Sequence, residues 1–139
     1  MIKPRVLFVC TENACRSQMA EGFLRHLAAD RFEMFSGGAQ PGELNPMAVD
    51  VMREVGIDIS GHRSKDVAEF LGQNFHFIIR VCDKVKETCP VLPGAIWYRD
   101  WNLEDPASAE GSPTQRMKVF RRVRDEIEGR VLEFIAKES

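Results

Sequence analysis

The alternation of short apolar runs with amphipathic segments is the feature that most constrains how this chain can fold. Arg5–Val9 is rich in apolar and β-branched residues, as in a buried strand of a parallel sheet, and Ser17–Asp30 repeats apolar residues at helical spacing. Three later runs also predict strands: Phe32–Ser36, Phe75–Val81 and Ala95–Tyr98. Strands that alternate with helices indicate an α/β fold with a parallel sheet.

Three more helices are predicted, two of them from helix-start signals. Asn45-Pro46 supplies a cap and a first-turn proline, and Gly56 closes that helix. A short helix is predicted over Ser64–Leu71. The capping box that begins at Ser112 starts a long helix over Pro113–Lys137. Residues 1–139 are therefore expected to form a single domain, with a four-stranded parallel sheet flanked by helices.

Length, composition and charge exclude several classes of protein. The chain has 139 residues, 44% of them apolar and 29% charged, which fits a globular domain rather than a disordered or fibrous chain. The net charge of −2 lacks the basic excess of most nucleic-acid-binding proteins. The N-terminal apolar run is too short for a signal peptide or a membrane span, so we expect a cytoplasmic protein without membrane association.

Four cysteines, Cys10, Cys15, Cys82 and Cys89, stand in a chain long enough to fold without disulfides. Their spacings differ from the Cys-x2-Cys of zinc ribbons and thioredoxin-like sites, and the histidines are scattered, so we expect no zinc site. Thiols stay reduced in the cytoplasm, where cysteine pairs are more often catalytic or redox-active than structural. Burial as small core residues is the alternative interpretation.

The loop Cys10–Ser17 lies between the first predicted strand and the first predicted helix. This placement directs backbone N–H groups and the positive end of the helix dipole toward one point, where a tetrahedral oxyanion fits. Arg16 can hydrogen-bond two oxygens of that anion, and Ser17 can donate to Cys10, whose thiolate the same field favours. Asn13 suits a position with positive φ. The loop predicts an activated nucleophile beside an anion pocket, with a core cysteine near a surface arginine as the alternative.

Two more residues that could carry chemistry follow later predicted strands. Because ligands of open parallel sheets bind beyond the carboxyl ends of the strands, Cys10, Cys82 and Asp105 are expected to meet at one edge. An acid there could protonate a leaving oxygen. Taken alone, however, Asp105-Pro106 is typical of the first turn of a helix.

The segment Cys10-x4-Cys15-Arg16-Ser17-Gln18-Met19-Ala20-Glu21 resembles the P-loop of low-molecular-weight protein tyrosine phosphatases. Within that fold the chain resembles the thioredoxin-coupled arsenate reductases over nearly its whole length. Further matching segments are Gly56–Ser60, Val81-Cys82, Cys89-Pro90, Glu104–Ala107 and Phe120–Ile127. The resemblance implies a phosphotyrosine protein phosphatase I-like fold and a cytoplasmic enzyme of arsenic detoxification that reduces arsenate to arsenite.

The resemblance also implies a role for each cysteine. Cys10 attacks arsenate while Asp105 protonates the departing oxygen. Cys82 then attacks Cys10 and releases arsenite, and Cys89 attacks Cys82 to leave a Cys82–Cys89 disulfide that reduced thioredoxin reopens. The pair supplies the two electrons that arsenate reduction needs. Cys15 packs beneath the loop without a required redox role.

The implied partners are arsenate and thioredoxin, with glutaredoxin or a small thiol as other reductants that suit a dithiol. No tightly bound cofactor is expected, and the protein is expected to be a monomer. Ser17 is placed beside the nucleophile. The residues implied to bind substrate are Thr11, Glu12, Asn13, Ala14, Cys15 and Arg16.

One departure from the family pattern concerns a potassium ion that some relatives bind near the loop. The matching positions are Asn13, Glu21 and Ser36 plus a later acid, which is Lys65 in this sequence, with Arg63 close by. An ammonium group could replace the ion, so we expect no bound potassium.

Two other functions fit the same residues. A low-molecular-weight phosphatase could act on phosphotyrosine or phosphoarginine, with Cys82 and Cys89 protecting Cys10 from oxidation. Ala107 argues against it, because phosphatases typically have an aromatic residue there. A non-enzymatic oxyanion or redox sensor could signal through the long helix Pro113–Lys137.

The segment between Cys82 and Cys89 must change shape on oxidation if it is helical. Seven helical steps separate two Cα atoms by about 10 Å, whereas a disulfide needs about 4.4–6.8 Å. Lys84, Lys86 and Glu87 have no need to be buried, so we expect local refolding over residues 82–93.

Overall fold

Four parallel strands form the centre of the protein in a computed structural model, which describes residues 2–83, 87 and 89–138. The sheet has the order β2-β1-β3-β4. The strands are β1 (Arg5–Cys10), β2 (Glu33–Gly38), β3 (Phe75–Arg80) and β4 (Ala95–Asp100). All four sequence-predicted strands are confirmed. β2 runs further than expected, because Gly37 and Gly38 continue the pairing with β1 instead of ending the strand.

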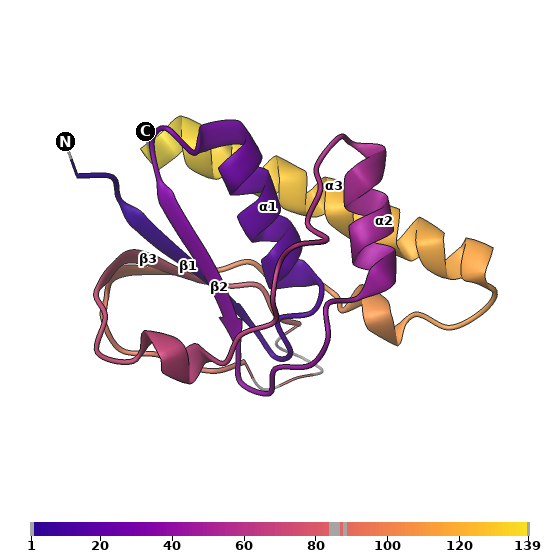
Figure 1. The fold of residues 1–139 in the computed structure, drawn as a ribbon, viewed down its shortest axis with the longest axis horizontal. Coiled ribbons are helices and arrows are strands. Elements are labelled where there is room, and N and C mark those ends of the chain that lie inside the picture. Colours follow the sequence, from indigo (N-terminus) through magenta and orange to yellow (C-terminus); the bar gives the residue numbers. More distant parts are fainter. Residues whose placement is uncertain (1, 84–86, 88, 139) are drawn as a thin grey trace.

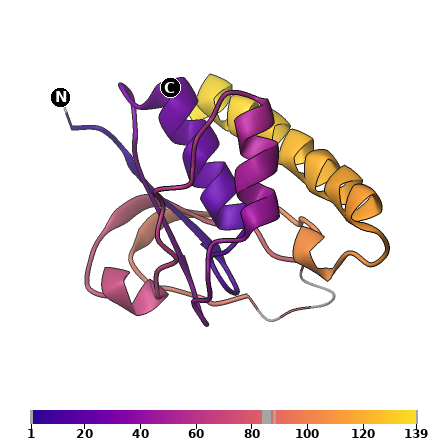
Figure 2. The same ribbon diagram turned by 45° about the vertical axis from the view of Figure 1, so that its right-hand side comes forward.

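Three helices cover one face of the sheet (Figures 1 and 2). They are α1 (Arg16–Ala28), α2 (Pro46–Glu54) and α3 (Pro113–Glu138). Val6 and Phe8 of β1 point into the large core beneath them, whereas Leu7 and Val9 join a smaller cluster on the other face. This alternation is expected for a strand that is buried on both faces. The arrangement confirms the predicted single-domain α/β fold. None of the helices described is both long and apolar enough to cross a membrane.

The helix predicted over Ser64–Leu71 is wrong. The structure has a single 3-10 turn there, η1 (Val67–Phe70). A second 3-10 turn, η2 (Pro106–Ser108), begins after Asp105, as the helix-start interpretation of Asp105-Pro106 indicates. Asp66 caps η1 by accepting a hydrogen bond from the N–H of Ala68. Gly72, with a φ of +83°, directs the chain into β3 before a longer helix can form.

The order of the strands places a ligand site at the end of β1. From β1 the chain passes through α1 to β2 on one side, and from β2 it crosses to β3 on the other side of β1. The carboxyl end of β1 is therefore the point where the direction of winding reverses, and open α/β sheets bind their ligands at such points. Cys10 is the last residue of this strand.

Candidate active site

The loop between β1 and α1 has the shape that its sequence predicts. Asn13 has a φ of 54°, which confirms the expected positive φ. The carbonyl oxygens of residues 11–15 all accept hydrogen bonds, either from α1 or from residues 40–64. These carbonyl groups therefore face away from the centre of the loop. No side chain caps the first turn of α1. The N–H groups at this helix terminus therefore suit an anion.

Gly38 on the neighbouring strand is a loop-supporting residue that the sequence did not reveal. A Cβ atom at this position would lie 2.7 Å from the backbone nitrogen of Asn13 and 2.8 Å from the carbonyl oxygen of Thr11. Only glycine lets β2 and the loop approach so closely. The Gly37-Gly38 pair that follows the predicted strand Phe32–Ser36 was the one sequence signal for this contact.

The sulfur of Cys10 lies 2.8 Å from Ser17 Oγ and 3.2 Å from the N–H of Asn13. Lys65 donates its backbone N–H to Asn13 Oδ1, which fixes the orientation of the Asn13 amide. Asn13 Nδ2 therefore donates to Ser17 Oγ at 2.7 Å, and the Ser17 hydroxyl keeps its own proton for Cys10. Two donors thus converge on the sulfur, as the stabilisation of a thiolate requires.

Gln18 and His62 support this arrangement from behind the loop, and sequence reasoning missed both. Gln18 Nε2 donates to Asn13 Oδ1 at 2.9 Å, so Gln18 Oε1 is the acceptor that faces His62 Nδ1, also at 2.9 Å. His62 accordingly carries its proton on Nδ1. Burial lowers the pKa of His62. The negative charge of Glu21 raises this pKa and the positive charge of Arg25 lowers it, and the net shift is downward, so the ring is neutral at pH 7.

Arg16 is buried at the start of α1, and its guanidinium binds the carboxylate of Glu87. Nη1 lies 2.5 Å from Glu87 Oε2 and Nη2 lies 2.9 Å from Oε1, and Nη1 also donates to the carbonyl of Leu103 at 3.0 Å. Burial works against the charge of Arg16, but the hydrogen bonds to Glu87 and the charge of Cys10 raise its pKa. The guanidinium is fixed at the pocket where the sequence placed it.

Glu87 requires a correction. Its burial was not expected, yet its side chain is only 16% exposed and is held by Arg16 and Thr11. Burial raises the pKa of Glu87, but the hydrogen bonds from Arg16 and Thr11 outweigh it and lower the pKa below its usual value. Lys84 and Lys86, which were grouped with Glu87, lie outside the described residues.

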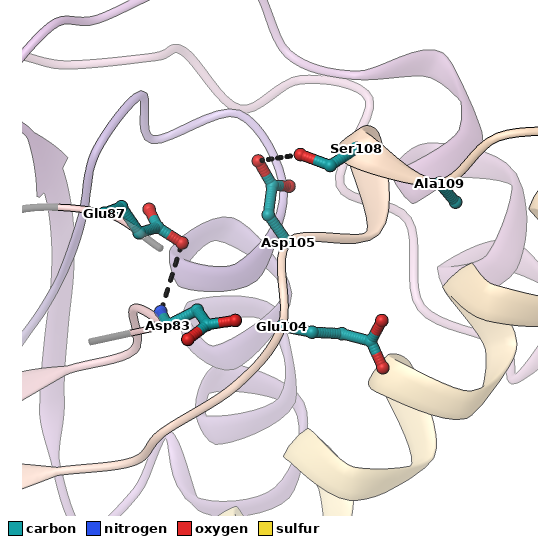
Figure 3. A pocket seen from close by; sticks show the side chains of 6 residues that line it. All are labelled: Asp83, Glu87, Glu104, Asp105, Ser108 and Ala109. Carbon is teal, nitrogen blue, oxygen red and sulfur yellow. Dashed lines mark hydrogen bonds between the residues drawn. The ribbon is translucent and has the colours of Figure 1, made fainter. Parts of the chain in front are cut away.

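Asp105 lies at the pocket and caps a turn at the same time. Its Oδ2 is 3.9 Å from Arg16 Nη2, and its Oδ1 accepts the N–H of Ala107 at the start of η2. Figure 3 shows Asp105 beside Glu87, with Glu104 directed away from them toward α3. Asp105 therefore fits both interpretations of its sequence: it is an acid at the pocket and also the residue that begins a helical turn. With the loop, Glu87 and Ala107 it lines a pocket of about 260 Å³.

The four cysteines separate into two groups. Cys82 and Cys89 form a disulfide with a Cα–Cα distance of 5.9 Å, and Cys10 and Cys15 are free and buried. Cys82 Sγ lies 3.9 Å and Cys89 Sγ 4.0 Å from the carbonyl oxygen of Val9, the residue before Cys10. Both sulfurs thus lie beside the carboxyl end of β1, the edge at which Cys82 was expected. Burial raises the pKa of Cys15, and the charges of Asp105 and Cys10 add to this, so it stays a thiol.

The positions considered for potassium surround an ammonium group. Lys65 Nζ lies 3.4 Å from Ser36 Oγ and 3.8 Å from Glu21 Oε1, and Ser36 donates a hydrogen bond to Glu21. Asn13 Oδ1 is engaged by hydrogen bonds from the protein itself. These atoms do not offer the open set of oxygens that a cation needs. Among residues 2–83, 87 and 89–138, no three His, Cys, Asp or Glu side chains gather as metal ligands would.

The fold and the loop define a class of protein: α/β domains with a loop of backbone N–H groups between the first strand and the first helix, over a cysteine at the strand end. The chain belongs to the low molecular weight phosphotyrosine protein phosphatase family, whose model matches residues 5–138. The resemblance seen in the sequence is thus confirmed.

Relatives within this family are named arsenate reductases. That of Shouchella clausii (strain KSM-K16) is 44% identical over 134 residues, which are 96% of each chain. A solved arsenate reductase in the phosphate binding state has a TM-score of 0.83 and 38% identity over 99% of this chain and 100% of its own. The thioredoxin-dependent arsenate reductase of Corynebacterium glutamicum has a TM-score of 0.74 and 29% identity, over 97% of this chain and 61% of its own.

Proposed function

We propose that this protein is an arsenate reductase that binds arsenate in the loop Cys10–Ser17. The observation that carries the proposal is the Cys82–Cys89 disulfide, whose sulfurs lie 3.9 and 4.0 Å from the carbonyl oxygen next to Cys10. A phosphatase needs one nucleophilic cysteine and no pair of resolving thiols. The relatives named arsenate reductases support the same choice.

In the first step the Cys10 thiolate attacks arsenic, so that an S–As bond forms and an As–O bond breaks. The departing hydroxide takes a proton from Asp105 and leaves as water. Arg16 and the N–H groups of the loop stabilise the negative charge of the oxygens. Ser17 and Asn13 hold the sulfur in place for the attack. Lys65 supplies a fixed positive charge beneath the loop, so potassium has no part in the proposal.

In the second step the Cys82 thiolate attacks Cys10 Sγ. An S–S bond forms, and the electron pair of the S–As bond passes to arsenic, which is reduced from arsenic(V) to arsenic(III) and leaves as arsenite after protonation. Cys89 then attacks Cys82 Sγ and expels the Cys10 thiolate, which leaves the Cys82–Cys89 disulfide. A dithiol protein such as thioredoxin returns the two electrons and regenerates the pair.

A single-turnover experiment tests this function. Fully reduced protein is mixed with one equivalent of arsenate, and free thiols and arsenite are counted. We expect one arsenite and the loss of two thiols per protein. Cys82→Ser should abolish reductase turnover but leave any phosphatase side activity of Cys10.

The name of the family favours a second candidate, a phosphatase. Hydrolysis of p-nitrophenyl phosphate with no loss of thiols to arsenate would support it over the first. A protein that shows neither reaction would instead be the non-enzymatic oxyanion or redox sensor.

A further inference from the structure

The carboxylate of Glu87 occupies the place where an oxyanion would meet Arg16. Both of its oxygens pair with the guanidinium, and Thr11 Oγ1 donates to Oε1 at 2.6 Å. The N–H of Asp83 donates to Oε2 at 3.1 Å (Figure 3). A fork of two N–H groups on two oxygens is also how arginine binds arsenate-like tetrahedral anions. The Glu87 carboxylate therefore binds Arg16 in the way that a free oxyanion would.

The carboxylate uses only part of what the pocket offers. Arg16 Nε is buried, and within the described part of the chain it has no hydrogen-bond partner. A carboxylate brings two oxygens to the site, whereas a tetrahedral oxyanion brings four. A free oxyanion can thus make bonds that Glu87 does not make, and the two ligands compete for the same guanidinium.

The disulfide constrains the chain on both sides of Glu87. Glu87 lies inside the ring that the Cys82–Cys89 bond closes, and its N–H donates to the carbonyl of Asp83 at 2.9 Å. The ring is anchored to the sheet, because Val81 donates its N–H to the carbonyl of Val9. Opening the disulfide removes this constraint. Asp83 and Asp105 line the same pocket as Glu87, and their negative charges then favour its departure.

We propose that Glu87 is an internal ligand of the oxyanion loop in the disulfide form, and that reduction of Cys82–Cys89 releases it so that an oxyanion can bind. The consequence for the cycle rests on the proposed function. Arsenate that became bonded to Cys10 while the disulfide was closed would find no thiol to resolve it. Glu87 keeps the loop closed to substrate until the dithiol has formed again.

Titration with inorganic phosphate tests this inference on the full chain. Its Kd is measured by calorimetry for the disulfide form and for the reduced form of the wild-type protein. If the carboxylate occupies Arg16 in about nine-tenths of the molecules, the disulfide form binds phosphate about tenfold more weakly. Equal Kd values for the two wild-type forms overturn the proposal without the need for any variant.

Variants then assign the effect to Glu87. Glu87→Gln and Glu87→Ala, with the disulfide intact, are expected to bind phosphate about as tightly as the reduced wild-type protein. Glu104→Gln is the matched control, because Glu104 lines the same pocket as Glu87 and Asp83 but pairs with Arg122 on α3. It should leave the weak binding of the disulfide form unchanged. If Glu87→Gln and Glu87→Ala both bind as weakly as the wild type, Glu87 is not the competing ligand.

The release of arsenite by reduced protein is measured in parallel. Release of arsenite with no effect of Glu87 on phosphate binding would refute this inference alone. Absence of arsenite, with the expected differences in phosphate affinity, would refute the proposed function and leave Glu87 as an internal ligand.

Discussion

Gly38 and Asn13 determine the shape of the loop through their backbones. Asn13 takes up a conformation with positive φ, which asparagine tolerates better than most residues, and this is visible from its place in the sequence. Gly38 acts from another strand, where its missing side chain leaves room for the loop. The position of the Cys10 sulfur thus depends on a glycine 28 residues further along the chain (10 to 38).

Gly38→Ala should distort the loop. Its Cβ would approach the backbone of Glu12 and Asn13 to within 2.8 Å, and such overpacking costs about 1–3 kcal/mol. We expect a lower free energy of unfolding in urea and weaker phosphate binding by the reduced protein. Gly61→Ala is the control, since nothing lies within 4 Å of a Cβ there. Unchanged phosphate affinity in Gly38→Ala would contradict the role given to this contact.

Among the elements, α2 and α3 are joined by a group of charges at the edge of the core. Glu54 at the end of α2 pairs with Arg121 and with the largely buried Arg124 of α3. Hydrogen bonds from Arg121, and then those from Arg124, lower the pKa of Glu54 to about 2. The pairing therefore contributes to stability at neutral pH and is lost as the carboxylate is protonated.

Glu54→Gln should lower the free energy of unfolding at pH 7 by about 1 kcal/mol at most, because the pairs are partly exposed. A carboxylate whose pKa is lowered by folding stabilises the fold at pH values above the pKa that it has in the unfolded chain. The difference between wild type and variant should thus be largest above pH 4.5 and shrink as the pH falls toward about 2. Urea unfolding at several pH values measures this difference, with Glu126→Gln, an exposed carboxylate on α3, as control. A difference that is constant with pH would contradict this account.

The segment around the disulfide should differ between redox states. The observed Cα–Cα distance of 5.9 Å cannot hold across seven steps of a helix, which span about 10 Å. If the reduced segment is helical, its amide hydrogens should exchange more slowly in the reduced form than in the oxidised form. Amide exchange over residues 82–93, read by mass spectrometry in both states, tests this. Equal protection in the two states would count against redox-coupled refolding.

At the scale of the whole molecule, the sequence predicts those site residues that come directly after a strand. Cys10, Cys82 and Asp105 each come after a predicted strand, and a parallel sheet brings such residues to one edge. The place of Glu87 could not be predicted, because it depends on the closed disulfide and on Arg16 more than on local pattern. The helix over Ser64–Leu71 was wrong for a similar reason, since the cap at Asp66 and the turn at Gly72 leave room for only one 3-10 turn.

The order of disulfides after a single turnover tests the central claim most directly. Reduced wild-type protein and the Cys89→Ser variant each receive one equivalent of arsenate, and mass spectrometry of peptides identifies the bonded cysteines. The account predicts one arsenite from each protein, with a Cys82–Cys89 bond in the wild type and a trapped Cys10–Cys82 bond in the variant. Arsenite released without a Cys10–Cys82 bond in Cys89→Ser would contradict it.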